Sequence, residues 1–227
     1  MNQSRQVLIS DLAGDLKPVK RPGQTTLPLL FWLIIVGIYS IAIVLITGGL
    51  RDNALGALVT APAYALEILV GTVAIGLLGH AALRTAIPGT GSWLRRAAIP
   101  LAAVGVWLAL IVFGLLVEPA LPPSMLGKRE FCFWQTLIFG APSFAALLWL
   151  ARGLLPLWPR ATAALAGAAS AAFPALLMQL ACMYAPAHAL THHFAPVAIV
   201  AGVGAVLGPL FLRRRAVVPR KRGGAIH

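Results

Sequence analysis

Charged residues are scarce in this sequence. Only 11% of its 227 residues are Asp, Glu, Lys or Arg, and 59% are hydrophobic, whereas soluble domains usually have about a quarter charged and about half apolar residues. Four runs contain no charged residue at all: 22–50, 97–117, 131–151 and 161–187. Each run can cross the hydrocarbon core of a bilayer, which takes about 20 residues. The scarcity of charge therefore excludes an ordinary soluble domain.

The sequence also lacks the motifs that carry most enzyme chemistry. It contains no GxSxG, no HExxH, no phosphate-binding loop and no pair of carboxylates at a usable spacing. It shows no repeat of fixed period and no inverted half of the kind found in many transporters. We therefore expect a protein that is not an enzyme and requires no cofactor.

The apolar runs predict the fold class. Residues 53–83 hold one acid, Glu67, and residues 194–212 hold no charge, which adds two spans to the four runs above. Backbone polar groups in a bilayer must be satisfied internally, so the spans are helices. We predict an all-α integral membrane bundle of six transmembrane helices with short loops, at 28–48, 62–83, 97–117, 133–151, 161–183 and 193–212. The leading region is too long for a secretory signal, so we expect the whole chain to be retained.

The basic residues predict the orientation. The net charge is +12, and all but Arg51, Lys128 and Arg129 of the 18 Lys and Arg residues fall on the side of the two termini. Because cytoplasmic loops carry the excess of Lys and Arg, both termini are expected in the cytoplasm, here of a bacterium, with the bundle in the inner membrane. Anionic lipids explain the basic tail at 213–227, so we expect no direct binding of nucleic acid.

The segment VLISDLAGDLKPVKR (7–21) stands out against this apolar background. On a helix, an apolar stripe forms, and two acids lie on its flank one turn apart. The stripe consists of Leu8, Ile9, Leu12, Ala13 and Leu16, and the acids are Asp11 and Asp15. Pro18 ends the helix. A helix of about three turns is marginal in water, so the segment either folds on a partner or is a leader that only sets orientation.

Only two cysteines occur, Cys132 and Cys182, and both fall at the outer ends of spans. A disulfide is allowed there, because that face of the membrane is oxidising. A thiol pair also binds soft metals or reacts with oxidants. The alternative is a pair of buried cysteines that act as small hydrophobes.

Three histidines, His188, His192 and His193, follow in the stretch AHALTHHF. Imidazole and thiolate together suit zinc, cadmium or copper. The spacing matches no strong metal motif, and neighbouring histidines on a helix point in different directions. Two interpretations of this stretch stay open. It either helps to hold a heavy-metal or redox ligand at the cysteines, or it is an ordinary interfacial loop.

Glu67 lies inside the second span, where an acid is costly and by default a functional candidate. It supports an alternative function as a small transporter or channel. The plainer alternative is a residue near the outer interface that water reaches or that pairs with Arg51. Small residues in the last two spans, including Gly204 and Gly208, indicate close packing inside the bundle or a seam between two copies.

The chain resembles the membrane-bound anti-sigma factors named for the negative regulator of sigma F. LISDLAGDLKPV is similar to that family's opening LxxxLAxDLxPV, and GAVLGPLFLRRR to its closing GxLLGPRLLRW. Arg129 and Cys132 before the fourth span, APSFAALLWLARGLLP within and after it, and Cys182 after an Ala/Gly-rich fifth span also match. In the family, acidic residues usually follow the second cysteine, whereas MYAPAHALTHHF stands here.

The resemblance implies an inhibitor of an extracytoplasmic-function sigma factor. Residues 1–27 would be the sigma-binding segment, 28–212 the transmembrane domain and 213–227 the basic tail. Sigma binding would fall to seven residues: Leu8, Ile9, Asp11, Leu12, Asp15, Leu16 and Pro18. Cys132 and Cys182 would sense an oxidant or heavy metal and release the sigma factor in a stress response. The implied partners are that sigma factor and the lipid bilayer, and a homo-oligomer stays open.

Overall fold

The computed structural model describes residues 3–14, 25–89 and 91–212. Within these ranges the chain is mostly helical and forms no strand; one isolated bridge joins Ser124 and Tyr184. The structure thus confirms the predicted all-α class.

Six helical segments are long and apolar enough to cross a membrane, as predicted. They are α2 (Thr26–Ile46), α4 (Pro62–Thr85), α5 (Trp93–Leu116), α6 (Cys132–Arg152), α7 (Pro159–Ala181) and a composite last segment. The last segment joins α8 (Pro186–His188), the π-helix η1 (Ala189–Phe194) and α9 (Ala195–Leu212). It begins at Pro186 and not at 193, because the wide π turn carries the helix through the histidine-containing stretch.

Two shorter helices lie outside these segments. Helix α1 (Gln3–Gly14) contains the first part of the segment 7–21, and its residues 4–14 are all exposed. Helix α3 (Ala54–Thr60) caps the bundle between α2 and α4, where the sequence predicted only a loop. It ends at Thr60, and the extended backbone of Ala61 leads into Pro62 at the start of α4, in keeping with the preference of the residue before proline.

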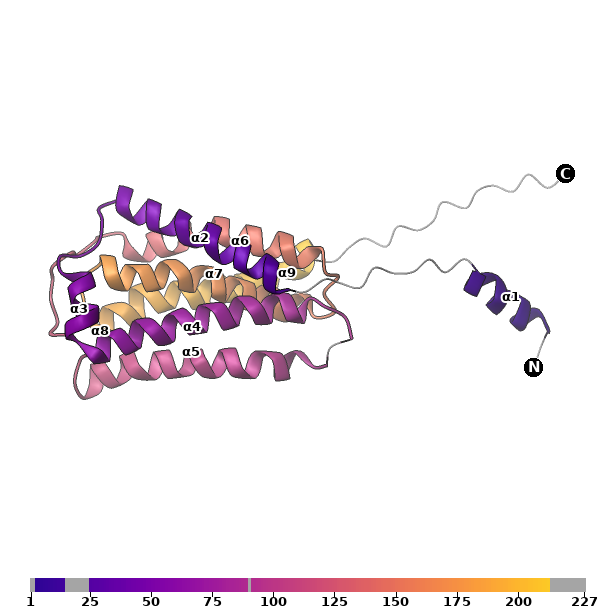
Figure 1. Cartoon of the computed structure of the whole chain (residues 1–227), viewed down its shortest axis with the longest axis horizontal. Helices are drawn as coiled ribbons and strands as arrows, with labels where there is room; N and C mark the ends of the chain where they lie inside the picture. The colour runs from indigo at the N-terminus through magenta and orange to yellow at the C-terminus, as the bar shows by residue number, and fades with distance from the viewer. Residues whose placement is uncertain (1–2, 15–24, 90, 213–227) are drawn as a thin grey trace.

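Helix α7 is the central helix of the bundle (Figure 1). In its most apolar window, 72% of the residues are buried, against 22–50% in the other five segments. Small residues let its neighbours approach closely. A Cβ at Gly167 would lie 2.6 Å from the carbonyl oxygen of Val200 in α9. The interior position expected for the fifth span is therefore observed.

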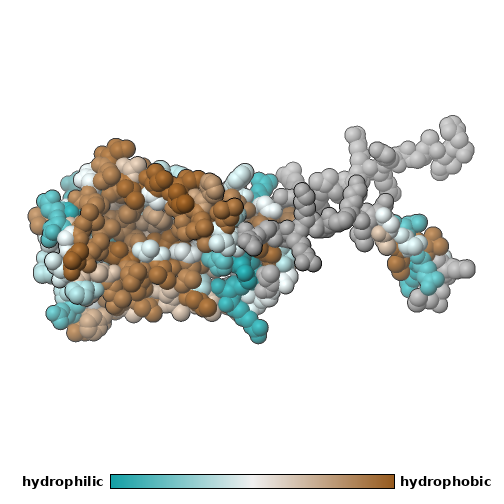
Figure 2. Space-filling model, in the orientation of Figure 1, coloured by the Kyte–Doolittle hydropathy of each residue, from teal (hydrophilic) through white to brown (hydrophobic). Residues whose placement is uncertain are grey.

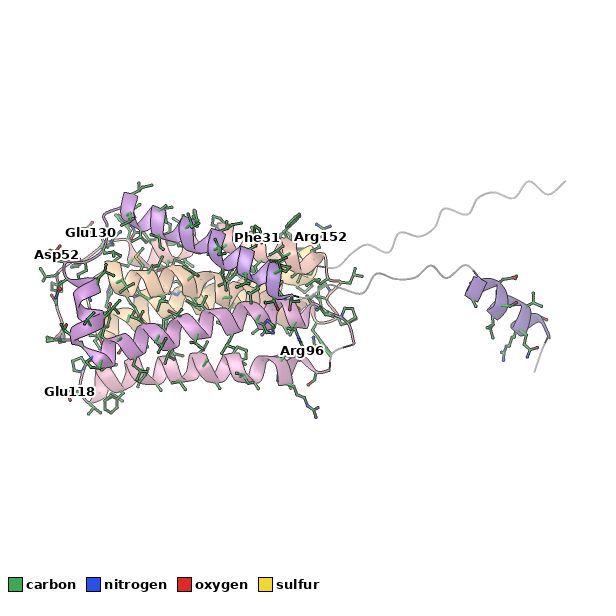
Figure 3. All side chains as sticks on the ribbon, in the orientation of Figure 1. Phe31, Asp52, Arg96, Glu118, Glu130 and Arg152 are labelled. Carbon is green, nitrogen blue, oxygen red and sulfur yellow. The ribbon has the colours of Figure 1, made fainter. Side chains whose placement is uncertain are left out.

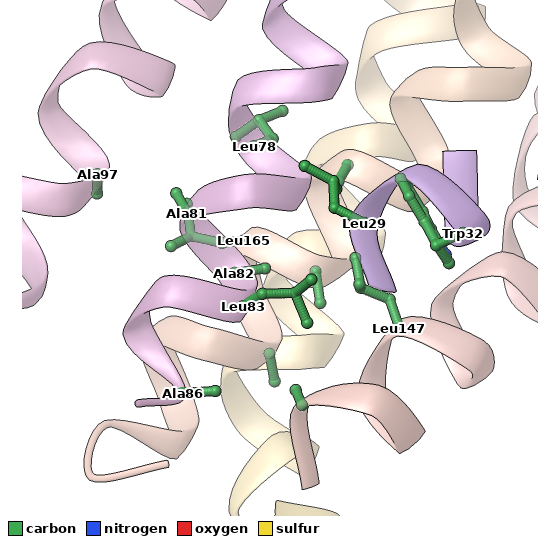
Figure 4. Close-up of a cluster of buried hydrophobic side chains, with 14 of the residues drawn as sticks. Leu29, Trp32, Leu78, Ala81, Ala82, Leu83, Ala86, Ala97, Leu147 and Leu165 are labelled. Atoms are coloured by element: carbon green, nitrogen blue, oxygen red, sulfur yellow. The ribbon is translucent and has the colours of Figure 1, made fainter. Parts of the chain in front are cut away.

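The largest buried apolar cluster joins α2, α4, α6 and α7 near the end of the bundle where α2 begins (Figure 4). Trp32, Leu83 and Leu147 are among its bulky side chains, and alanines fill the space between them. Trp32 Nε1 donates a hydrogen bond to the backbone oxygen of Ser143 at 3.0 Å. Helix α2, which follows the N-terminal segment, is thereby fixed to α6.

The surface separates into an apolar belt and two polar ends (Figure 2). Large apolar side chains of the belt face outward, among them Ile46, Trp149 and Leu210, each at least 75% exposed. Such exposure is costly in water and ordinary against lipid. We call the end that carries Asp52, Glu118 and Glu130 the distal end, and the end that carries Arg96 and Arg152 the terminal end (Figure 3). The arrangement is that of a multi-pass membrane protein.

Candidate functional site

Two thiols and two imidazoles meet at the distal end of the bundle. The ligand atoms of Cys132, Cys182, His188 and His193 all lie within 4.8 Å of one another. Both cysteines are free and fully buried, and His193 is only 1% exposed. We call these four side chains the thiol–imidazole cluster. The cluster unites both predicted sensing cysteines with two of the three candidate metal-binding histidines.

The ends of three membrane-spanning segments position the cluster. Cys132 is the first residue of α6, Cys182 follows the last residue of α7, and His188 and His193 lie at the start of the last segment. The chain reverses direction between Ala181 and Pro186, which returns the histidines to the cysteines. The cluster therefore lies where the ends of three membrane-spanning segments meet.

The π-helix decides which histidines join the cluster. Residues five apart on an α-helix point about 140° away from each other. The wider turn of a π-helix, with its i→i+5 hydrogen bonds, brings such residues toward one face. In η1 this turn sets the rings of His188 and His193 edge to face, 5.2 Å apart. π-turns often occur at functional sites.

His192 lies outside the cluster. Its ring stacks on His188 with 4.2 Å between centroids, and its Nδ1 lies 2.7 Å from the hydroxyl of Thr191. His188 Nε2 lies 3.4 Å from the Cys182 sulfur. Neither ring nitrogen of His193 has a hydrogen-bond partner among the described residues. His192 therefore has a polar neighbour, whereas His193 lies beside the two cysteine sulfurs.

The cluster favours a thiolate at Cys182. The neighbouring Cys132 thiol holds the pKa of the Cys182 thiol below its ordinary value, and the nearby imidazoles of His188 and His193 act in the same direction. Burial opposes them. A thiolate is the form of cysteine that binds metals and attacks oxidants.

Two arginines satisfy carbonyls at the C-terminal end of α7. The last carbonyls of a helix lack partners within it. Arg129 Nε donates to the oxygen of Ala181 at 3.4 Å, and Arg51 Nη1 to that of Cys182 at 3.4 Å. The backbone N–H of Arg51 donates to Leu180 at 3.0 Å. Two of the three basic residues on the distal side therefore hold the segment that carries Cys182, a role that sequence reasoning missed. The sequence offered one signal for this role, because both arginines are predicted on the side of the bundle away from the other basic residues.

Glu67 is buried but does not pair with Arg51. The hydroxyl of Tyr184 donates to its carboxylate, at 3.2 Å to Oε1 and 3.4 Å to Oε2. Arg51 lies instead over the rings of Tyr64 and Tyr184. Glu67 also lines a cleft of about 340 Å³, together with Glu118 of the distal end. The alternative interpretation of an ion pair between Arg51 and Glu67 is therefore wrong. The partner of Glu67 is the hydroxyl of Tyr184.

The predicted sigma-binding residues divide between described and undescribed parts of the chain. Leu8, Ile9 and Leu12 lie on α1, each 58–64% exposed, and Asp11 is exposed beside them. Asp15, Leu16 and Pro18 lie outside the described residues. The structure thus presents four of the seven residues on one solvent-exposed helix.

Comparison with known proteins identifies one family. The family model described as negative regulator of sigma F matches residues 12–213. Neither the curated proteins nor the solved structures contain a match. The match spans all six membrane-crossing segments and both cysteines.

Proposed function

The chain belongs to the family of negative regulators of sigma F, and we propose that it is a membrane-bound anti-sigma factor that sequesters an extracytoplasmic-function sigma factor. A sigma factor held at the inner membrane cannot reach core RNA polymerase. The family match over residues 12–213 carries the proposal, because it includes the end of α1 and the whole bundle.

Helix α1 is the proposed sigma-binding element. Its exposed Val7, Leu8, Ile9 and Leu12 have no partner within the described chain, and covering apolar surface contributes about 25 cal/mol per Å². The polymerase-binding surface of a sigma factor is a groove between helices, which suits an apolar stripe. Asp11 on the flank of the stripe would meet a basic rim of that groove.

We propose that a signal at the thiol–imidazole cluster weakens the binding of α1 to the sigma factor. Cys132 begins α6, and α6 accepts the Trp32 hydrogen bond through the oxygen of Ser143. A movement of α6 against α7 would therefore shift α2 and the segment that precedes it. Couplings between distant sites typically amount to about 1–3 kcal/mol, which changes affinity several-fold to about a hundred-fold.

Substitution of Leu12 by Lys tests the binding element. The full-length protein is co-expressed with each extracytoplasmic-function sigma factor of its host and a reporter gene for that factor. Leu12→Lys sets a charge in the apolar contact, so we expect at least a tenfold loss of affinity, about 1.4 kcal/mol, and constitutive transcription. Ser10→Lys is the matched control, since it adds the same charge about 160° around the helix.

Full repression by a Leu12→Lys protein would contradict the proposed role of α1 in binding the sigma factor.

A transporter that uses Glu67 is the second candidate function, because Glu67 is buried at 2% exposure and lines a cleft. The Glu67→Gln variant distinguishes the two functions. Repression should persist under our proposal, because the Gln oxygen still accepts the Tyr184 hydrogen bond, whereas a proton-coupled transporter would lose activity.

The sensing part is tested separately by Cys132→Ser combined with Cys182→Ser. We expect this double variant to repress normally and to lose induction by oxidants and heavy metals. Unchanged induction in a correctly inserted double variant would contradict a sensing role for the cysteines.

A further inference from the structure

We infer that the thiol–imidazole cluster is a closed four-ligand site for a thiophilic divalent cation, Zn²⁺ or Cd²⁺, in which His188 and His193 complete the coordination begun by Cys132 and Cys182. The inference deepens the proposed function by naming the chemical class of the signal. It rests on that function only for the step from cation binding to sigma-factor release.

The spacing of the ligand atoms suits tetrahedral coordination. With metal–sulfur bonds of about 2.3 Å and metal–nitrogen bonds of about 2.0 Å, neighbouring ligand atoms lie about 3.3–3.8 Å apart. Cys182 Sγ and His188 Nε2 are already at 3.4 Å, and every other pair is within 4.8 Å. Closing the remaining separations requires shifts of about 1 Å.

The surroundings of His193 point independently to a ligand. Its ring is fully buried, yet neither nitrogen has a hydrogen-bond partner among the described residues. Buried polar groups are rarely left in this state, because each unsatisfied group costs about 1–3 kcal/mol. The neighbours of the ring include both cysteine sulfurs and the imidazole of His188, each of which can bind a metal. A bond to a cation would satisfy the ring.

Charge balance also favours a divalent cation. Binding leaves two thiolates and two neutral imidazoles around the ion, and any thiol proton still present passes to solvent. The complex is then electrically neutral, which a buried site requires because an uncompensated charge is costly there. A trivalent ion or an oxyanion would leave net charge in the same space.

The histidines separate this site from a simple redox pair. A disulfide between Cys132 and Cys182 needs no imidazole, whereas four protein ligands close a zinc-type site and leave no open position for a catalytic water. A bound cation would join the ends of α6, α7 and the last segment.

Cobalt binding to the purified full-length protein tests the site. The protein is reduced in detergent, freed of metal and titrated with Co²⁺, and the Co²⁺ is then displaced by Zn²⁺ or Cd²⁺. We expect one ion per chain, the ligand-field bands of tetrahedral cobalt and a sulfur-to-cobalt charge-transfer band that weakens in Cys132→Ser. His193→Gln should lower the affinity at least about tenfold, because even outer-shell changes cost about that much.

His192→Gln is the matched control, since it removes the same ring from the next position, outside the cluster. Thermal unfolding of each variant without metal separates lost binding from lost folding. The site is overturned if the natural protein binds no Co²⁺, or if folded His193→Gln and His192→Gln proteins bind it equally. Sigma-factor retention is measured in the same samples. Cation binding without release would leave the site standing and overturn its role in the proposed function.

Discussion

Tyr184 links two segments that the sequence places far apart. Its hydroxyl donates to Glu67 and accepts from the backbone N–H of Ala120 at 3.1 Å, while its carbonyl accepts from Ser124 at 2.9 Å. Burial, and then the neighbouring Glu67, raises the pKa of Tyr184 above its ordinary value. The hydroxyl therefore stays protonated and remains a donor to the carboxylate.

Removing that hydroxyl should destabilise the distal end. Tyr184→Phe leaves the buried Glu67 without its donor and Ala120 without its acceptor, so we expect the free energy of unfolding to fall by about 1–3 kcal/mol. Thermal unfolding in detergent measures the change. Tyr39→Phe is the control, because the half-buried Tyr39 makes no hydrogen bond with a described residue through its hydroxyl. Equal melting temperatures for the two variants would argue against the bond.

Single residues show where prediction from sequence stops. The cost of an acid in a membrane span identified Glu67, but its partner Tyr184 lies on a loop whose path the sequence does not specify. Cys132 and Cys182 were placed at the same depth by counting spans. The choice of His193 over His192 depends on one π turn, which no residue spacing in AHALTHHF predicts.

At the scale of elements, the helices of this bundle approach as closely as their glycines permit. Gly204 of α9 lies against the backbone of Ala163 in α7, and a Cβ there would also lie 3.2 Å from Phe144. Gly202, one half-turn away, faces open space. The two positions offer a comparison within one helix.

Gly204→Ala should destabilise the bundle, whereas Gly202→Ala should not. The first substitution forces α9 away from α7, and overpacking of this kind costs about 1–3 kcal/mol. The second only improves helix propensity, by up to about 1 kcal/mol. Chemical unfolding of both variants in detergent gives the difference. A Gly204→Ala protein as stable as the Gly202→Ala protein would show that α7 and α9 do not rely on this contact.

The six long helices were predictable because each needs only an uncharged run of sufficient length, and the bilayer admits little else. Helix α3 was not, since ALGALVT (54–60) is too short to distinguish a helix from a loop. The arrangement of the spans was also beyond prediction, apart from the interior position of the small-residue helix α7. Apolar side chains face both lipid and core, so hydrophobicity does not separate the two faces.

At the scale of the molecule, acidic residues lie at one end of the bundle and basic residues at the other (Figure 3). Asp52, Glu118 and Glu130 occupy the distal end, and Arg96 and Arg152 the terminal end (Figure 3). Arg51, Lys128 and Arg129 depart from this pattern, and two of the three, Arg51 and Arg129, bond to protein carbonyls. The asymmetry supports a cytoplasmic terminal end.

Reporter fusions should show this orientation. An enzyme that is active only outside the cytoplasm should be active when inserted after Lys128 and inactive when fused after Leu212, because the loops rich in Lys and Arg stay inside. A cytoplasm-specific reporter at the same two positions is the control and should give the reverse. Activity of the first enzyme at Leu212 would contradict the proposed topology and remove α1 from reach of a sigma factor.

The central position of α7 has a consequence for how the chain is made. Translation delivers α1 first and α7 only as the fifth of the six spans, so α2, α4, α5 and α6 enter the bilayer before the helix on which most of them pack. Cys132 is then made before Cys182 and the histidines. Under the proposed function, a nascent chain on the ribosome would consequently carry its inhibitory segment while its sensor is still incomplete, and repression would be established before the ability to relieve it.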